Sequence, residues 1–289
     1  MSIIKLDDVS FVYGKKSPYE IHALKNITLS IEQGSITGII GHTGSGKSTL
    51  IQMLNGLIRP DSGTIFINGN DIWEKPKQIS KIRYTVGMVM QYPEYQLFAD
   101  TVWEDIAYGP KNMGITGDEL AKRVDESATF CGLSKEILEK SPFDLSGGQK
   151  RRVALAGVMA MDPEILVLDE PAAGLDPRGR REILGGIAKY KEQSNKTIIV
   201  VSHSMEDMAM YCDNVIVLSH GELLTQGACS QVFSQKDLLT KSGLDVPEIT
   251  NTVCALREQG ILIPNSIYTV QGAFDAIKEY MNRGDSNGI

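Results

Sequence analysis

Four nearly unbroken apolar runs stand out along the chain, and each ends in polar residues. They cover residues 36–40, 86–90, 165–168 and 198–201. Continuous apolar runs of four or five residues are typical of strands that are buried on both faces of a parallel sheet. Because ligands of such sheets bind beyond the carboxyl ends of the strands, we expect the four polar endings to meet in one crevice.

Other parts of the chain have different periods. The first thirty residues alternate between apolar and polar positions, with a polar loop over 14–19, which predicts an antiparallel sheet. Residues 49–57 (TLIQMLNGL) are apolar at helical spacing and predict a helix that stops before the following Arg-Pro pair. Residues 214–227 predict a hairpin that turns at His220 and Gly221.

Helical patterns divide the chain further. The stretch from about 98 to 160 is mostly helical and lies between strand-rich segments, so we predict an inserted helical subdomain. Near the C-terminus, two amphipathic helices are predicted around Val253 and Ile277. Two such helices form too small a core to stand alone and should pack on the main body or on a second subunit. We therefore predict a main domain over 1–228 and a helical extension over 229–289.

Charge, the length of the apolar runs and the spacing of the cysteines limit the classes of function that the chain can have. The 289 residues carry 29 Lys and Arg against 36 Asp and Glu, a net charge of -7 with no long basic block, so nucleic acid is not an expected partner. No apolar run approaches the roughly 18 residues of a membrane helix, and the acidic pair Asp7 and Asp8 is unlike a signal peptide. The four cysteines are scattered, which predicts reduced, buried thiols.

The first polar ending contains the strongest motif. Residues 41–48 match G-x-x-x-x-G-K-[ST] between a predicted strand and a predicted helix, the context of a phosphate-binding loop. Its glycines let backbone N–H groups surround phosphate oxygens, Lys47 reaches the outer phosphates, and Ser48 can ligate magnesium. The candidate nucleotide-binding residues here are Gly41, His42, Thr43, Gly44, Ser45, Gly46, Lys47, Ser48 and Thr49.

The other three endings supply candidate catalytic groups. Asp169 would hold the magnesium ion, directly or through water, and Glu170 would activate an attacking water. The alternative is that both carboxylates cap the helix predicted to begin near Asp176. His203 is a candidate for a role near the terminal phosphate, although a lone histidine at a strand end is usually structural. Gln91 differs from an ordinary surface residue only in its position, because it follows an apolar run as the other three polar endings do.

A second candidate anion site lies at LSGGQ, residues 145–149. A serine followed by two glycines at a predicted helix N-terminus offers N–H donors to a phosphate. The basic residues 150–152 follow in the first turn, where the helix dipole disfavours cations, so a nearby anion would relieve the conflict. A solvated basic patch is the alternative.

Taken together, these motifs resemble the ATPase subunit of ABC transporters. GHTGSGKST, LSGGQ and ILVLDEP occur in that family's order over residues 3–230. The resemblance implies an α/β P-loop NTPase core with an antiparallel β subdomain, an inserted helical subdomain and a C-terminal helical extension. It also implies ATP and Mg²⁺ as cofactors, and two chains that meet head to tail around each ATP.

The resemblance assigns roles to further residues. Tyr13 matches the aromatic residue that stacks on adenine, and Asp176 matches the aspartate that links the two sites. Ala172 departs from the family pattern, which usually has a hydroxyl residue there, and this puts the hydrolysis rate in doubt. The residues implied to contact the partner's ATP are Ser146, Gly147, Gly148 and Gln149. The candidate ligands of Mg²⁺ are Ser48, Gln91 and Asp169.

The segment 91–110 points to a narrower group within the ABC transporters than the general motifs do. Its pattern Q-x-P-E-x-Q-L-F followed by T-V-x-E-D-I-A-Y-G-P-x-N resembles energy-coupling factor importers, and GHTGSGKST and DEPAAGLDP resemble the second of their two ATPase paralogues. The resemblance implies import of vitamins or transition-metal ions at the cytoplasmic face of the membrane. The implied partners are a paralogous ATPase, a transmembrane coupling subunit and, indirectly, small substrate-binding membrane proteins.

Two alternatives stay open. One is the homodimeric ATPase of a cobalt or nickel importer, and the other is a soluble ABC protein that acts on ribosomes or DNA.

In importers the segment 91–110 receives a coupling helix of the membrane subunit. We hypothesise that its acidic residues face arginines of that helix, over an apolar floor. A solvated acidic surface with buried aromatic residues is the competing interpretation. The acidic candidates are Glu94, Asp100, Glu104 and Asp105, and the floor candidates are Tyr95, Leu97 and Phe98.

Overall fold

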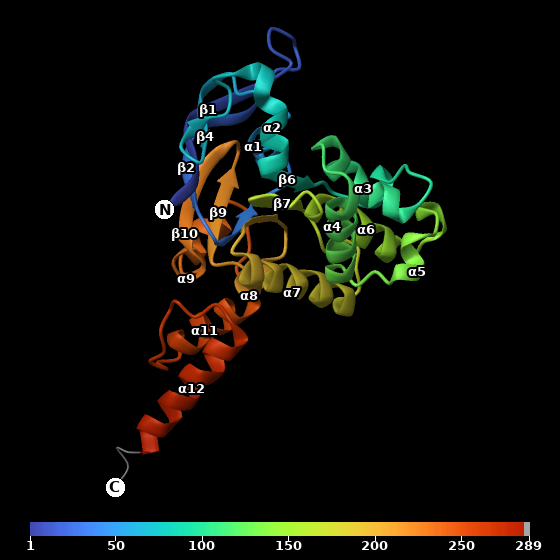
Figure 1. The fold of residues 1–289 in the computed structure, drawn as a ribbon. Helices are drawn as coiled ribbons and strands as arrows, with labels where there is room; N and C mark the ends of the chain where they lie inside the picture. Colours follow the sequence, from blue (N-terminus) through green and yellow to red (C-terminus); the bar gives the residue numbers. More distant parts are fainter. Residues whose placement is uncertain (286–289) are drawn as a thin grey trace.

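Two sheets organise the chain in a computed structural model that describes residues 1–285 (Figure 1). The smaller sheet is antiparallel, with the order β2-β1-β4-β5. Its strands are β1 (Ser2–Tyr13), β2 (Ile21–Glu32), β4 (Ser62–Ile67) and β5 (Asn70–Asp71). The larger sheet has the order β10-β9-β3-β8-β7-β6. Its strands are β3 (Ile36–Ile40), β6 (Val86–Val89), β7 (Ile165–Asp169), β8 (Thr197–Val201), β9 (Asn214–Ser219) and β10 (Glu222–Ala228).

Helices surround both sheets and form the C-terminal end of the chain (Figure 1). The longer helices are α1 (Lys47–Leu54), α2 (Ile79–Thr85), α3 (Val102–Asn112), α4 (Gly117–Phe130), α6 (Gly147–Met159), α7 (Pro177–Ser194), α8 (Met205–Tyr211), α11 (Glu248–Glu258) and α12 (Val270–Asp285). The shorter ones are α5 (Lys135–Leu138), α9 (Cys229–Phe233) and α10 (Lys236–Lys241), with 3-10 turns η1 (Pro76–Gln78), η2 (Pro93–Gln96) and η3 (Pro142–Asp144).

The four apolar runs pair as neighbouring parallel strands, as predicted. β3 pairs with β8, β8 with β7, and β7 with β6, all in parallel. Alternate residues point to opposite faces of the sheet, so each strand contributes to two cores. In β8, Ile198 belongs to the core on one face and Ile199 to the core on the other. Burial on both faces explains why these strands are apolar throughout.

Helix α1 lies between the two sheets. Its apolar residues Leu50 and Met53 pack in one core with Leu6 of β1 and Val167 of β7. The helix is shorter than the periodicity predicts, because it ends at Leu54, and Leu57 is left 46% exposed. The predicted N-terminal antiparallel sheet and the hairpin turn at His220 are both confirmed.

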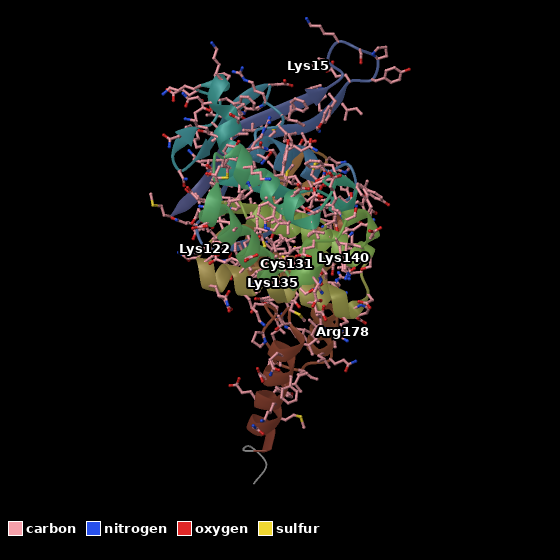
Figure 2. All side chains as sticks on the ribbon, turned by 45° about the vertical axis from the view of Figure 1, so that its right-hand side comes forward. Lys15, Lys122, Cys131, Lys135, Lys140 and Arg178 are labelled. Atoms are coloured by element: carbon pink, nitrogen blue, oxygen red, sulfur yellow. The ribbon has the colours of Figure 1, made fainter. Side chains whose placement is uncertain are left out.

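The inserted helical subdomain lies to one side of the larger sheet, between β6 and β7 in sequence (Figure 1). Figure 2 shows Lys122, Cys131 and Lys135 on this subdomain, far from Lys15 in the loop between β1 and β2. Helices α3 and α6 each begin with a capping box, in which the first and fourth residues satisfy each other's backbone N–H groups. Both helix starts are therefore held in a defined position.

The C-terminal end contains the two predicted amphipathic helices, and it projects away from the sheets (Figure 1). The residues just after 228 are not part of this projection, because Phe233 and Leu239 are fully buried in the main core. A separate small cluster forms around Val253, Ile263 and Ala273. We propose that the extension begins with α11 rather than at residue 229.

Two negative expectations concern membranes and cysteines. None of the helices within residues 1–285 is both long and apolar enough to cross a membrane. All four cysteines are free, and Cys131, Cys212 and Cys229 are buried as predicted, whereas Cys254 is only partly buried. Burial raises the pKa of the Cys131 and Cys229 thiols to about 12, so these side chains act as apolar packing groups.

Phe233 should be the main anchor between the body and the extension. Its ring is fully buried and lies 6.0 Å from the ring of Tyr268, between α11 and α12. We expect Phe233→Ala to lower the free energy of unfolding by about 3–5 kcal/mol, measured by urea denaturation. Phe274→Ala is the matched control, because Phe274 is 60% exposed, and it should change stability by less than about 0.5 kcal/mol. Equal effects of the two substitutions would contradict this assignment.

Candidate active site

The register of the larger sheet aligns the ends of four neighbouring parallel strands, β3, β8, β7 and β6. Ile39 of β3 pairs with Val201 of β8, and Val201 pairs with Asp169 of β7. On the other side, Leu168 pairs with Val89 of β6. The phosphate-binding loop, His203, the Asp169–Glu170 pair and Gln91 therefore follow neighbouring strands at one edge of the sheet. The predicted crevice rests on this edge.

The phosphate-binding loop needs glycine at two positions, both for the positive φ angle and because a side chain would have no room there. Gly41 has φ 156° and Gly46 has φ 103°. A Cβ atom at Gly41 would lie 2.3 Å from the Leu218 carbonyl oxygen, and one at Gly46 would lie 2.5 Å from that of Ala23. Gly44, in contrast, has open space where its Cβ would lie. The loop is thus packed tightly against the protein on one side and open on the other, as a phosphate cradle requires.

The hairpin turn between β9 and β10 holds this loop from behind. The N–H of Gly221 donates to the Ser45 carbonyl at 3.2 Å, and the N–H of His220 donates to Nε2 of His42 at 3.2 Å. The two imidazole rings lie 4.6 Å apart. Because Nε2 accepts, the proton of His42 is on Nδ1, which donates to the Thr43 carbonyl at 2.8 Å. The side chain of His42 therefore shapes the loop, and only its backbone is left for a ligand.

Lys47 has the geometry of a phosphate-binding lysine. Its side chain is buried, and Nζ donates to the carbonyls of Gly41 at 2.6 Å and His42 at 3.0 Å. An ammonium group has three N–H bonds, so one donor remains for a ligand. Burial lowers the pKa of Lys47, while the nearby charges of Glu170 and Asp169 raise it. One cation and two carboxylates thus share this site.

The two carboxylates after β7 face the site and do not cap a helix. Asp169 is the last residue of the strand, and Glu170 adopts a left-handed backbone with φ 51°. The cap of α7 is Asp176, which accepts from the N–H of Gly179 at 2.7 Å. Burial raises the pKa of Asp169, and burial together with the Asp169 charge raises the pKa of Glu170 to about 7. The capping alternative for Asp169 and Glu170 is therefore wrong.

His203 lies beside Glu170. Its Nε2 is 3.2 Å from Oε1 of Glu170, but the two atoms do not have hydrogen-bond geometry, and Oε1 is buried without a hydrogen-bond partner. Burial and the charge of Lys47 both lower the pKa of His203, which favours the neutral imidazole. A buried carboxylate oxygen without a partner is unusual, and it leaves Glu170 with an acceptor that no described residue satisfies.

The candidate magnesium ligands offer only oxygen atoms, as this hard cation prefers. The Ser48 hydroxyl is exposed on the first turn of α1, Gln91 is exposed after β6, and Asp169 is partly buried. Within residues 1–285 no group of three or more His, Cys, Asp or Glu side chains could hold a metal ion by itself. These residues fit a magnesium ion that is held partly by the phosphates of a nucleotide and by water.

Tyr13 lies at the end of β1, next to α1. Its hydroxyl and that of Thr49 are 3.3 Å apart, and its ring meets the edge of Phe11 at 4.8 Å. The residue remains 40% exposed. Thr49 is buried, and its side chain supports Tyr13 through this contact. Tyr13 is thus positioned near the phosphate-binding loop with part of its ring open.

The LSGGQ segment lies in the helical subdomain and not beside the phosphate-binding loop (Figure 1). Ser146 and Gln149 form the capping box of α6, in which Gln149 Oε1 accepts from the Ser146 N–H at 3.0 Å. Gly147 and Gly148 are exposed, with open space around their Cβ positions. The segment therefore presents free glycine backbone to the outside of the chain.

The arginines that follow do have anions nearby, but these are carboxylates of the chain itself, and the alternative of a solvated basic patch is wrong for them. Arg151 is 7% exposed and pairs with Glu94, and Arg152 donates to Glu182 at 2.7 Å. Neither is part of a solvated basic patch, and their charges are compensated within the chain. Sequence reasoning also missed the pair of Arg180 and Asp207, whose Nη2 and Oδ2 lie 2.6 Å apart and connect α7 to α8.

The segment 91–110 is partly as predicted. Glu94 was expected at the surface but is largely buried, and Glu104 and Asp105 accept backbone N–H bonds of their own segment, although Glu104 stays exposed. Leu97 is partly buried. Tyr95 and Phe98 are 85% and 58% exposed, so the interpretation with buried aromatic residues is wrong. A hollow of about 280 Å³ is lined by Phe98, Ala99, Asp100, Glu104, Tyr108 and Lys111.

Comparison with known proteins agrees with this geometry. The ABC transporter family matches residues 24–173. "Energy-coupling factor transporter ATP-binding protein EcfA2" of Caldanaerobacter subterraneus subsp. tengcongensis is 50% identical over 98% of this chain and 99% of its own length. The protein of the same name from Clostridium perfringens is 49% identical over 98% of this chain and 99% of its own.

Solved structures of the same family have the same fold. The cassette cbiO1 of Clostridium perfringens, part of the ABC transporter complex cbiONQ, is 39% identical, with a TM-score of 0.74 over 83% of this chain and 94% of its own. A dimeric ATP-binding cassette bound to ADP and Pi is 30% identical, with a TM-score of 0.70 over 78% of this chain and 98% of its own. On these grounds, the chain belongs to the energy-coupling factor transporter ATP-binding proteins of the ABC transporter family.

Proposed function

We propose that this chain is the ATP-hydrolysing subunit that energises an energy-coupling factor importer at the cytoplasmic face of the membrane. The observation that supports this most is the alignment of four strand ends, which brings Lys47, Asp169, Glu170 and His203 to one edge of the sheet. The relatives, at about half identity over nearly the whole chain, are named as ATP-binding proteins of energy-coupling factor transporters.

Each residue then has a distinct task. Backbone N–H groups of the open loop and the free donor of Lys47 bind the β- and γ-phosphates, and Tyr13 supports the adenine. Ser48, Gln91 and Asp169 would hold magnesium, which offsets the charge of the phosphates. Glu170, whose pKa is about 7, accepts the proton of the attacking water through its unpartnered Oε1. Neutral His203 beside it donates toward the terminal phosphate.

The site is completed by a second chain. Ser146, Gly147 and Gly148 are exposed and face outward, and one similar solved cassette is dimeric. In a head-to-tail pair, this segment binds the nucleotide of the other chain, and Asp176 connects the two sites. We propose a paralogous ATPase as the partner. A homodimer is the second candidate, because the similar solved cassette bound to ADP and Pi is a dimer.

The coupling surface is proposed around the hollow beside α3. Tyr95, Phe98 and Tyr108 offer exposed aromatic rings, and Asp100 and Glu104 remain as exposed acidic residues. This combination suits an amphipathic helix with basic residues. We propose that a transmembrane coupling subunit places such a helix here, and that small substrate-binding membrane proteins contact the complex indirectly.

Removal of the proposed base should separate binding from hydrolysis. We expect Glu170→Gln to retain ATP binding and to lose more than about 100-fold in turnover, because the amide cannot accept the proton. Binding and phosphate release are the two measurements. Glu164→Gln, at the opposite end of β7, is the control and should hydrolyse normally. Full turnover by Glu170→Gln would refute the assignment of the base.

Substitution in the tight part of the phosphate-binding loop should abolish binding. Gly41→Ala would force a Cβ atom against the Leu218 carbonyl, so we expect ATP affinity to fall more than about tenfold. Gly185→Ala in α7, where a Cβ meets open space, should bind ATP normally. Equilibrium titration with a fluorescent ATP analogue measures both variants, and unchanged affinity of Gly41→Ala would show that the loop is not the cradle.

The composition of the native complex distinguishes the two candidate assemblies. We expect purification of the tagged chain from native membranes in mild detergent to recover a second ATPase, one transmembrane subunit and several small membrane proteins, identified by mass spectrometry. Recovery of this chain alone as the ATPase, with one dedicated membrane set, would favour the homodimer. Recovery of ribosomal proteins only would overturn the transport function.

A further inference from the structure

We propose that Arg151 is a positioning residue that joins the Gln91 segment, the Ser146 segment and the turn after Glu170 into one unit. This inference rests on the proposed function, because it assigns a mechanical link between the coupling surface and the two ATP sites of a dimer. The hydrogen-bond partners of its guanidinium within the described residues are Glu94 and Ala173, neither of which is a candidate nucleotide-binding residue, so Arg151 acts through the segments that it holds.

Arg151 lies in α6, and its guanidinium contacts two other segments of the chain. Nη2 and Nε donate to the two carboxylate oxygens of Glu94, at 3.1 and 3.3 Å, and Nη1 donates to the Ala173 carbonyl at 2.5 Å. The side chains of Arg151 and Glu94 are only 8% and 17% exposed. The planar fork of arginine suits this two-sided arrangement, which a lysine could not reproduce.

The first segment carries Gln91. Glu94 lies in η2, three residues after Gln91, and the two are connected by Tyr92 in a left-handed backbone with φ 56° and by the buried Pro93. Such a short, constrained connection leaves little freedom between Glu94 and Gln91. The exposed rings of Tyr95 and Phe98 follow directly. A shift of the coupling surface is therefore transmitted to Glu94 and to Gln91 together.

The second segment is the turn after the candidate base. The Ala173 N–H donates to the Glu170 carbonyl at 3.1 Å, so the turn is closed on itself. Asp176 follows three residues later and caps the N-terminus of α7. By holding the Ala173 carbonyl, Arg151 fixes the path between Glu170, which serves this chain's ATP, and Asp176, which faces the partner.

The third segment is α6 itself. Arg151 is two residues after Gln149, whose side chain closes the capping box with Ser146. Helix α6 also packs against η2. A buried arginine and a buried carboxylate each lose water on burial, and separation of the pair leaves both without compensation. The pair therefore favours motion of the three segments as one body over motion of any one of them alone.

A double-mutant cycle on the assembled transporter tests this link. Arg151→Met, Glu94→Gln and the double variant are made in the complete complex, which is reconstituted in nanodiscs. The ATPase kcat, the KM for ATP and the melting temperature are measured for each. Arg123→Met is the matched control, because Arg123 also forms an arginine–carboxylate pair in this subdomain, but its partner Glu119 lies in the same helix, α4.

We expect Arg151→Met to lower kcat about tenfold and to leave KM within about twofold, because the residue orders the site without binding ATP. Arg151→Met should also lower the melting temperature, since Glu94 is left as an unpaired buried charge. The double variant has no charge at either position and should regain the melting temperature, while its kcat stays low. Arg123→Met should hydrolyse at the wild-type rate.

Other outcomes overturn the inference in distinguishable ways. If the double variant regains kcat along with the melting temperature, the pair is only structural. If KM rises and kcat is unchanged, Arg151 acts on nucleotide binding. If Arg123→Met loses activity equally, the effect belongs to the whole subdomain. Absence of ATP hydrolysis by the wild-type complex would instead refute the proposed function itself.

Discussion

Parallel pairing of β3, β8, β7 and β6 is the constraint on which the site depends. Parallel neighbours run in one direction, so their carboxyl ends lie at one edge of the sheet. A one-residue slip in register would turn every side chain to the opposite face. Because both faces are buried, the two cores fix the register, and the positions of Asp169 and His203 follow from the packing of residues far from the chemistry.

The charges at this edge are mutually dependent. Burial is the main cause of the pKa shifts of Lys47, Asp169 and Glu170. The two carboxylates oppose it by raising the pKa of Lys47, and Lys47 opposes it by lowering the pKa of both carboxyl groups. A nucleotide brings phosphate charges into this balance, and the free donor of Lys47 and the open side of the loop are directed at that anion. The strained backbone of Glu170 is consistent with a position that function requires.

Much of this could be predicted from the sequence, because apolar period and motif spacing are local signals. They indicated the central strands, the inserted helices and the residues at the strand ends. Contacts between distant residues leave no such signal: Arg151 and Glu94 are far apart in the chain, and so are His42 and His220. The carboxylate partners of Arg151 and Arg152 were not predicted, because a charge pattern shows which ions are present but not which of them pair. The continuation of the main core beyond residue 228, through Phe233 and Leu239, was similarly hidden by their polar neighbours.

Burial decides which acidic residues of the segment 91–110 can meet another protein. Glu94 is withdrawn by Arg151, and Asp105 is occupied by the N–H groups of Phe98 and Ala99. Asp100 and Glu104 are left at the surface beside exposed aromatic rings. The same segment therefore has an outer set of residues that suits recognition of a partner and an inner residue that connects it to α6. Under the function proposed above, this division would give the coupling surface a physical route to the nucleotide, because contact on the outer set would displace a backbone that Arg151 attaches to both proposed sites.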